Sequence, residues 1–142
     1  MIETRICAKI LLRNSRGQFL VLRRSGTHPR YAHYPDLPGG EVENDDESLL
    51  LAVQREVGEE TSLAIDVFSA VLLHAHTVLR TEEATPDVMT YLLYLDDIKE
   101  DNPQVVVSWE HDRYSWRSAE ELTGFEDAFQ LKIDYAVKHK LI

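Results

Sequence analysis

The chain has 142 residues, 44% of them hydrophobic and 28% charged, a composition that suits one folded globular domain and excludes collagen-like, low-complexity and disordered proteins. The 25 acidic residues outnumber the 15 basic ones and give a formal net charge of −10, which disfavours a protein that binds nucleic-acid phosphates. With a single cysteine, Cys7, and no apolar stretch long enough for a membrane span or a signal peptide, we expect a cytoplasmic domain over residues 1–142 with neither nucleic-acid nor membrane partners.

The first elements of the chain are predicted to be two strands. Apolar residues alternate with others from Ile6 to Leu12, and this period of two is typical of a strand with one buried face. Asn14 to Gly17 contains turn-forming residues, and Gln18 to Arg24 has the composition of a second strand. We therefore expect the two strands to pair as a β-hairpin.

Positive charge is concentrated in this part of the chain. Residues 1–30 hold seven Lys and Arg residues and one acidic residue, a net charge of +6, whereas residues 31–142 carry −16. One explanation is that the outer face of the hairpin is basic and solvated. The other is that Arg23, Arg24 and Arg30 bind the phosphates of a substrate.

A loop and a helix are expected next. Ser25 to Gly40 contains three prolines and three glycines in sixteen residues, and a loop of that length in a compact domain is often functional. A helix is predicted from a cap at Asp45 or Asp46 to about Thr61, with acidic residues in its first turn. Its apolar stripe consists of Leu49, Leu50, Val53 and Val57.

The rest of the chain alternates between β-rich and amphipathic segments. Further strands are predicted at Ala64–Leu79, Val88–Leu95, Val105–Trp109 and Tyr114–Trp116, a short helix at Glu120–Leu122 capped by Ser118, and a closing helix at Asp127–Leu141. Strands and helices in this order indicate a mixed sheet with helices on its faces. The predicted fold class is therefore α/β.

Three glutamates meet near the end of the first predicted helix. Glu56, Glu59 and Glu60 are spaced i, i+3 and i+4 and so share one face within a turn. Carboxylates this close repel one another, so they need either full solvation or a compensating cation. Ligands that offer only oxygen favour Mg²⁺ or Mn²⁺ over zinc or copper. A solvated acidic face and a divalent-cation site are both consistent with the triplet alone.

The segment that contains this triplet resembles the signature of the Nudix hydrolases, the MutT-like family. That signature is Gly, five residues, Glu, seven residues, Arg-Glu, an aliphatic residue, any residue, Glu-Glu, any residue, Gly and an aliphatic residue. Its matches in this sequence are Gly40, Glu47, Arg55, Glu56, Val57, Glu59, Glu60 and Leu63. The sequence departs from it twice, because six residues separate Gly40 from Glu47 and Ser62 replaces the last glycine.

The resemblance implies a fold and an activity. Nudix domains are α/β/α sandwiches with a mixed β-sheet, and they hydrolyse a phosphoanhydride bond in a nucleoside diphosphate linked to another group, with Mg²⁺ or Mn²⁺ as cofactor. The implied ligand is a small-molecule nucleotide or nucleotide-linked diphosphate, and a homodimer is compatible with the family. Markers of the subclasses specific for coenzyme A, ADP-ribose and dinucleoside polyphosphates are missing around Leu37 and at Val78 to Arg80, which favours a nucleoside triphosphate.

The resemblance also implies roles for individual residues. The metal ligands would be Glu56, Glu59, Glu60 and the carbonyl of Gly40. Catalysis would depend on Glu56, Arg55 and Glu59. Arg55 would orient the glutamates through charge-assisted hydrogen bonds, and Glu56 is the candidate base that takes the proton of the attacking water.

Many members of the family hold a further acidic ligand near a later strand. Glu110 is the first candidate here, because Tyr114 to Arg117 resembles the segment that follows that ligand, and Glu82 and Glu83 are the alternatives. These features together predict a Nudix pyrophosphohydrolase. The alternative from another class is a catalytically inactive Nudix-like module that binds a nucleotide or regulates a partner.

Overall fold

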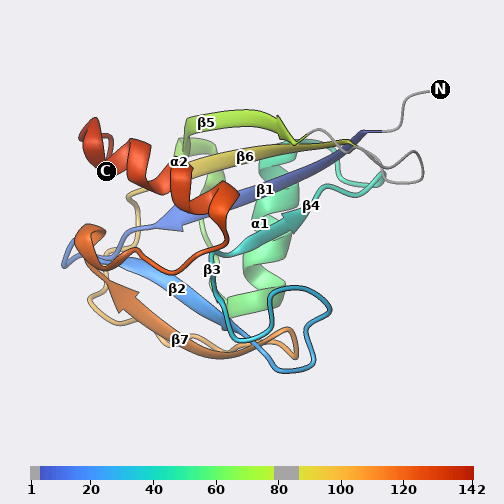
Figure 1. Ribbon diagram of the computed structural model, residues 1–142. Coiled ribbons are helices and arrows are strands. Elements are labelled where there is room, and N and C mark those ends of the chain that lie inside the picture. The colour runs from blue at the N-terminus through green and yellow to red at the C-terminus, as the bar shows by residue number, and fades with distance from the viewer. Residues whose placement is uncertain (1–3, 79–86) are drawn as a thin grey trace.

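The computed structural model describes residues 4–78 and 87–142 (Figure 1). Leu79, predicted to end a strand, and the segment 80–86 lie outside these residues. The strands are β1 (Thr4–Leu12), β2 (Phe19–Arg24), β3 (Pro35–Asp36), β4 (Gly39–Glu41), β5 (Val71–Val78), β6 (Asp87–Leu95) and β7 (His111–Arg117). The helices are α1 (Leu49–Thr61) and α2 (Asp127–Lys138), with short 3₁₀ helices η1 (Val67–Ser69) and η2 (Ala119–Glu121).

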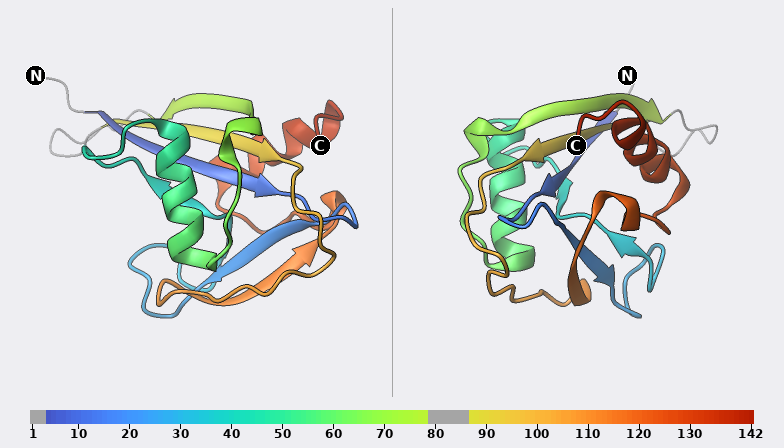
Figure 2. Two further views of the ribbon diagram at one scale, coloured as in Figure 1. Left: turned by 180° about the vertical axis from the view of Figure 1, so that it is seen from behind. Right: turned by 90° about the vertical axis from the view of Figure 1, so that its left-hand side faces the viewer.

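The strands form two sheets. The larger sheet has the order β4-β1-β6-β5, in which β1 runs parallel to β6 and antiparallel to β4. The smaller sheet has the order β3-β2-β7 and is antiparallel. The two helices α1 and α2 cover opposite faces of the larger sheet (Figure 2). This arrangement confirms the predicted α/β/α sandwich with a mixed sheet.

The centre of the fold is the C-terminal half of β1. Residues Ala8 to Leu12 are all buried, because alternate side chains of the strand face two different helices. One core cluster on β1 includes Ala8, Ile10, Leu12, Val53 and Val57, and the other includes Leu11, Phe129 and Ile133. β1 therefore fixes where α1, with the glutamates near its end, lies relative to β4.

The predicted hairpin of the first two strands is wrong. Both strands form, but β1 has β4 and β6 on its two edges, so β2 pairs with β3 and β7 in the other sheet. The chain turns at the buried Asn14, whose Oδ1 accepts hydrogen bonds from the backbone N–H groups of Arg16 and Gln18 at 3.0 and 2.9 Å. Among the described residues, one isolated β-bridge joins this part of the chain, between Arg13 and Phe19. The basic residues of this region therefore do not form the outer face of a hairpin.

The helix that carries the acidic triplet starts later than predicted. It begins at Leu49, and its cap is Ser48, whose Oγ accepts a hydrogen bond from the backbone N–H of Leu51 at 3.1 Å. A hydroxyl at this position satisfies a donor that the first helical turn leaves open. The predicted caps Asp45 and Asp46 precede the helix, and its first turn contains no acidic residue.

Later segments also differ from the prediction. The strand predicted to start at Ala64 begins only at Val71 and is preceded by η1. Val105–Trp109 is not a strand. Val105 is buried in the core, and the backbone N–H of Val106 donates to the carbonyl of Thr61 at 3.0 Å, so the segment is tied to the end of α1 instead of to a sheet. The strand predicted at Tyr114–Trp116 lies within the longer β7, and the predicted short helix is η2.

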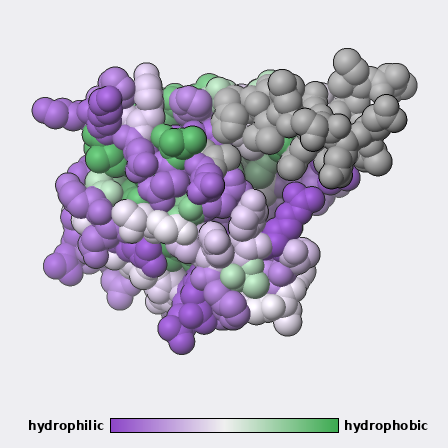
Figure 3. Space-filling view, viewed as in Figure 1, coloured by the Kyte–Doolittle hydropathy of each residue, from purple (hydrophilic) through white to green (hydrophobic). Residues whose placement is uncertain are grey.

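The face of the molecule that carries α2 is mostly hydrophilic, with hydrophobic side chains gathered beside that helix (Figure 3). Leu131 and Tyr135 are exposed apolar side chains of α2. In the part of the chain that the structure describes, neither helix has the length and hydropathy needed to cross a membrane.

Candidate active site

The acidic triplet lies at the C-terminal end of α1, and its three side chains differ in exposure. Glu59 keeps 59% of its side chain exposed, Glu56 keeps 15% and Glu60 keeps 3%. The helix therefore presents one carboxylate to solvent, one to a partly covered surface and one to the interior. A solvated acidic face does not describe this triplet.

Arg55 connects the two outer glutamates. Its Nη1 donates to Glu56 Oε1 at 3.1 Å and to Glu59 Oε2 at 3.3 Å. Its Nε and Nη2 donate to the two carboxylate oxygens of Asp46, at 3.0 and 2.9 Å, and such a bidentate contact fixes the guanidinium plane. Arg55 thus makes the hydrogen bonds to glutamate that the resemblance implies, and its charge offsets the repulsion between the carboxylates.

Asp46, and not Glu47, is the main acidic partner of Arg55. Glu47 is exposed and makes no hydrogen bond or ion pair with the residues that the structure describes. The signature spacing fits Asp46 when counted from Gly40, with five residues between them, and fits Glu47 when counted from Arg55, with seven residues between them. In the structure the carboxylate that contacts Arg55 is that of Asp46.

Two glycines of β4 bring its backbone close to β1 and α1. A Cβ atom on Gly39, whose φ is 128°, would lie 2.1 Å from the carbonyl oxygen of Ala8, so a side chain is sterically excluded there. A Cβ atom on Gly40 would lie 2.9 Å from Cδ of Glu56 and would displace that carboxylate. Glu56 therefore lies directly against the backbone of Gly40.

Glu60 points into the interior. The backbone N–H of Gly39 donates to its Oε1 at 3.0 Å, whereas its Oε2 has no hydrogen-bond partner among the described residues. Burial raises the pKa of Glu60 to about 8, although the positive charge of Lys9 opposes this effect. Glu60 is thus a buried carboxyl group with one oxygen held and the other unpaired.

A buried cluster of charged side chains lies behind Glu60. Asp36 of β3 accepts hydrogen bonds from His111 Nε2 at 2.9 Å and from Arg24 Nη2 at 3.3 Å, and Lys9 Nζ lies 3.2 Å from its Oδ1. Burial alone would raise the pKa of Asp36, but these neighbours outweigh it and hold that pKa far below its usual range. Asp36 is therefore ionised and neutralises buried cations.

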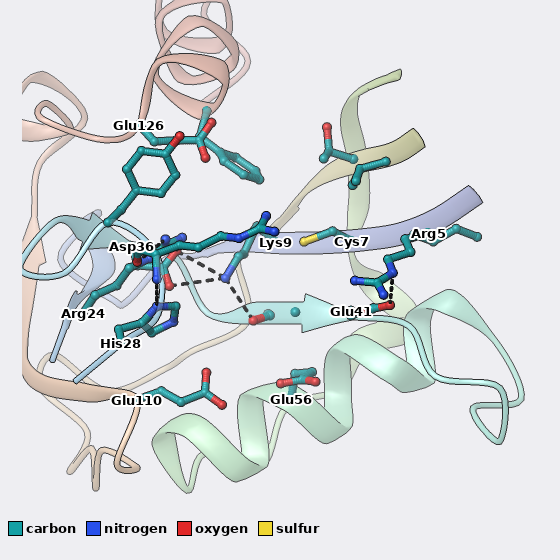
Figure 4. A pocket seen from close by; sticks show the side chains of 18 residues that line it. Arg5, Cys7, Lys9, Arg24, His28, Asp36, Glu41, Glu56, Glu110 and Glu126 are labelled. Carbon is teal, nitrogen blue, oxygen red and sulfur yellow. Dashed lines mark hydrogen bonds and ion pairs between the residues drawn. The ribbon is translucent and has the colours of Figure 1, made fainter. Parts of the chain in front are cut away.

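A pocket of about 840 Å³ is lined by Lys9, Asp36 and Glu56 and also by Phe129 of α2. Figure 4 shows the carboxylates of Glu56 and Glu110 at one end of the pocket and Glu126 on the opposite wall, beside α2. Lys9 and Asp36 lie between them. A pocket of this volume is large enough for a nucleotide-sized ligand.

The three arginines predicted to bind phosphate separate in the structure. Arg24 and Arg30 line the pocket, whereas Arg23 is paired with Asp112 through two hydrogen bonds of 2.8 and 2.7 Å and is not part of the pocket wall. Arg24 donates to Asp36 and to the carbonyl of Arg30, and its Nε has no partner in the described part of the chain. Of the three predicted arginines, Arg24 and Arg30 therefore face the pocket and Arg23 does not.

Glu110 precedes β7 and lines the same end of the pocket as Glu56. Its carbonyl accepts a hydrogen bond from the backbone N–H of Ser25 at 2.9 Å, which ties this segment to the end of β2. Its position is compatible with the further acidic ligand that the resemblance implies. Glu82 and Glu83, the alternatives, lie outside the described residues.

The carboxylates suit a hard divalent cation but are not gathered around one point. Within residues 4–78 and 87–142, no group of three or more His, Cys, Asp or Glu side chains is arranged as a metal site. Arg55 holds Glu56 and Glu59, and Glu60 is turned toward Gly39. The donor set nevertheless fits Mg²⁺ or Mn²⁺, because it consists of oxygen atoms and includes the unpaired Oε2 of Glu60.

Lys9, Asp36 and His111 are the site residues that sequence patterns did not reveal. Lys9 lies between apolar residues in the middle of a strand, and a lysine in such a position is a candidate for a buried, paired charge. No comparable pattern marks Asp36 in its loop. His111 directly follows Glu110, but adjacency in sequence does not show that its side chain is buried.

Comparison with known proteins agrees with the fold. A NUDIX domain model matches residues 3–138. A MutT protein from Methanosarcina mazei Go1 is 29% identical, with a TM-score of 0.78, and the match covers 98% of this chain and 96% of that chain.

Two other similar structures share the fold at lower identity. An Ap4A hydrolase from C. elegans, in a binary complex, is 19% identical with a TM-score of 0.64 and coverage of 95% of this chain and 98% of that chain. The NUDIX domain of Shewanella oneidensis NrtR, complexed with ADP ribose, is 18% identical with a TM-score of 0.69 and coverage of 100% and 90%. No curated protein matches the sequence.

Proposed function

The chain belongs to the family of NUDIX domain proteins, and we propose that it is a pyrophosphohydrolase that depends on Mg²⁺ or Mn²⁺. The proposed reaction breaks a phosphoanhydride bond in a nucleoside triphosphate, or in another nucleoside diphosphate linked to a further group. The observation that carries the proposal is the pocket, which has acidic side chains at one end and cationic side chains along its wall.

The charges of the pocket suit a diphosphate that arrives with a divalent ion. Arg24 and Arg30 offer positive charge to phosphate oxygens, and the ion would neutralise the remaining charge at the acidic end. An anionic ligand would otherwise be repelled by a protein of net charge −10. The residues proposed to hold the ion are Glu56, Glu59, Glu60, Glu110 and the carbonyl of Gly40.

Hydrolysis requires that charge developing on the phosphate oxygens be stabilised and that a base take a proton from water. When bound, the divalent ion supplies charge neutralisation and activates water for attack on phosphorus. Arg55 orients Glu56 and Glu59 through the hydrogen bonds described above. Glu56 is the proposed base, because burial raises its pKa and so increases its affinity for a proton.

The class of substrate is supported by the shape of the pocket and by the similar structures. The pocket extends from the acidic end to β6 and α2, which leaves room for a nucleoside beside the diphosphate. Two of the similar structures are named with nucleotide ligands or substrates, Ap4A and ADP ribose. A nucleoside triphosphate is the first candidate here, because the sequence lacks the markers of the more specialised subclasses.

A nucleotide panel tests the proposal. The purified protein is incubated with Mg²⁺ and with nucleoside triphosphates, ADP-ribose, dinucleoside polyphosphates and coenzyme A, and the products are identified by ion chromatography. We expect turnover of at least one nucleotide, and the product pair shows which phosphoanhydride bond breaks. EDTA is the matched control and should abolish turnover.

A different result would identify the alternative function. If calorimetry shows tight binding of a nucleotide while no compound in the panel is hydrolysed with Mg²⁺ or Mn²⁺, the protein is a nucleotide-binding or regulatory module. Failure to bind or hydrolyse any nucleotide would contradict both functions.

A further inference from the structure

We propose that His111 is a positioning residue that, anchored by Asp36, sets the orientation of the Glu60 carboxylate. This inference rests on the proposed function, in which Glu60 is a ligand of the divalent ion. It assigns a role in ion binding to the buried Asp36–His111 pair, which belongs to neither the signature nor the pocket end with Glu56 and Glu110.

The imidazole of His111 lies between two carboxyl groups. Its Nε2 donates to Asp36 Oδ2 at 2.9 Å, and its Nδ1 lies 3.5 Å from Glu60 Oε2. The His111 side chain is fully buried, with an exposed fraction of 0%. His111 Nδ1 and Glu60 Oε2 are both buried atoms that lack a hydrogen-bond partner among the described residues. Two such atoms facing each other are expected to pair after a small movement of either side chain.

The ring of His111 is held from the side opposite to Glu60. Asp36 accepts hydrogen bonds from Lys9 Nζ and Arg24 Nη2 at 3.3 Å each, and from the backbone N–H of Leu37 at 2.9 Å. These contacts fix the Asp36 carboxylate, and the hydrogen bond to Nε2 then fixes the plane of the imidazole. The position of Nδ1 is therefore determined by a rigid, buried framework.

Glu60 needs a second partner because its hydrogen bond with Gly39 leaves the position of Oε2 unfixed. Gly39 N–H holds Oε1 at 3.0 Å, but a single hydrogen bond allows the carboxylate plane to rotate. Contact of Oε2 with His111 Nδ1 limits this rotation, whichever of the two atoms carries the proton. Partners behind the ligands of a metal ion commonly change metal affinity by 10-fold to 100-fold when they are removed.

Two substitutions separate the contact with Glu60 from the contact with Asp36. In His111→Asn the amide nitrogen can take the place of Nδ1 beside Glu60, whereas in His111→Gln it can take the place of Nε2 beside Asp36. Mn²⁺ binding is measured by electron paramagnetic resonance of the free ion, without nucleotide. The matched control is His139→Gln, since His139 is an exposed histidine near the end of α2.

We expect His111→Gln to weaken Mn²⁺ binding by on the order of 10-fold, His111→Asn to weaken it less, and His139→Gln to leave it unchanged. Parent-like affinity in both His111 variants would overturn the inference. So would an equal loss in both, because a residue that only fills space gives no rescue by Asn. If the parent itself does not bind Mn²⁺, the proposed function fails. If the parent binds Mn²⁺ and both His111 variants bind it equally well, only the role of His111 fails.

A measurement on the unmodified protein covers the case in which a buried variant does not fold. Nitrogen-15 NMR of the histidine side chains follows His111 and His139 during a titration with Mg²⁺. The proposal predicts that the Nδ1 resonance of His111 shifts when the ion binds the Glu60 carboxylate that His111 contacts, whereas the resonances of His139 stay constant. A constant His111 resonance under saturating Mg²⁺ would overturn it.

Discussion

The candidate active site has two halves that are built in different ways. The outer half consists of Asp46, Arg55, Glu56 and Glu59, and the inner half consists of Lys9, Asp36, Glu60 and His111. The outer half comes from α1 and the residues just before it, and it is partly exposed. The inner half comes from β1, β3, α1 and β7, and all of its members are buried.

Exposure decides how firmly each half is held. Ion pairs near solvent are screened and each contributes about 0–1 kcal/mol, so Glu56 and Glu59 can exchange Arg55 for another cation. The inner charges have lost their contact with water, and removing one leaves its partners buried and unpaired. The outer half is therefore suited to adapt to a ligand, and the inner half to hold one ligand group in a fixed position.

The largest effect is expected from Asp36→Asn. The change leaves Lys9 and Arg24 buried without their carboxylate, so it should lower the free energy of unfolding by about 3–5 kcal/mol. Urea denaturation measures this loss. Removal of an exposed pair, as in Arg13→Gln, which loses the contact with Asp96, should cost less than about 1 kcal/mol.

A double variant checks the physical reason. If the loss in Asp36→Asn comes from unpaired cations, adding Lys9→Met removes one of them and should restore part of the stability. Simple addition of the two single losses would show instead that Asp36 acts through packing alone and would contradict the proposed contrast between the halves.

The second prediction compares one proposed ion ligand from each half, Glu59 from the outer half and Glu60 from the inner half. Glu59→Gln and Glu60→Gln should each lower kcat by on the order of 10²-fold. Glu60→Gln should also stabilise the metal-free protein at pH 8 by about 2 kcal/mol, because it removes an ionisable group from the interior. Glu59→Gln should change stability by less than about 0.5 kcal/mol. Parent-like turnover in the Glu60 variant would count heavily against the proposed ion site.

Because the pKa of Glu60 is raised in the folded protein, the free energy of unfolding is expected to depend on pH. Between its ordinary value of 4.5 and the folded value of about 8, the folded protein keeps a proton that the unfolded chain has released. The free energy of unfolding of the metal-free protein should therefore fall as pH rises from about 4.5 to about 8. Denaturation at several pH values measures this slope, and it should be smaller in Glu60→Gln.

A smaller effect tests the partner of Arg55 in the outer half. Asp46→Asn weakens the bidentate contact that fixes the guanidinium, so we expect a loss of roughly tenfold in kcat through misplacement of the glutamates. Glu47→Gln is the matched control and should behave like the parent. The reverse result, with Glu47 sensitive and Asp46 tolerant, would restore the assignment based on the signature.

The outer half could be predicted largely from the sequence, because its members are close together in the chain. The spacing of Glu56, Glu59 and Glu60 places them on one helical face, and Arg55 precedes them directly. The contact of Arg55 with Asp46 could not be predicted, since counting residues does not show whether an insertion falls before or after a carboxylate.

The inner half and the pairing of the strands could not be predicted in this way. Lys9 and Asp36 are 27 residues apart, and Asp36 and His111 are 75 residues apart, so only tertiary packing brings them together. The same limit explains the error at β1 and β2. A period of two identifies a strand, but it does not show which strand lies beside it.

The smallest predicted effect lies at the end of α1, where the signature has glycine and this chain has Ser62. Ser62 adopts φ 62° and ψ 15°, a left-handed conformation in which its backbone N–H donates to the carbonyl of Gly58 at 2.9 Å. Glycine adopts this conformation without strain, so Ser62→Gly should stabilise the protein by about 1 kcal/mol, measured as a higher Tm and urea midpoint. At Ser118, where φ is −65°, the same substitution should bring no gain. Equal effects at the two positions would show that Ser62 carries no strain, and that the departure from the signature leaves the stability of this helix end unchanged.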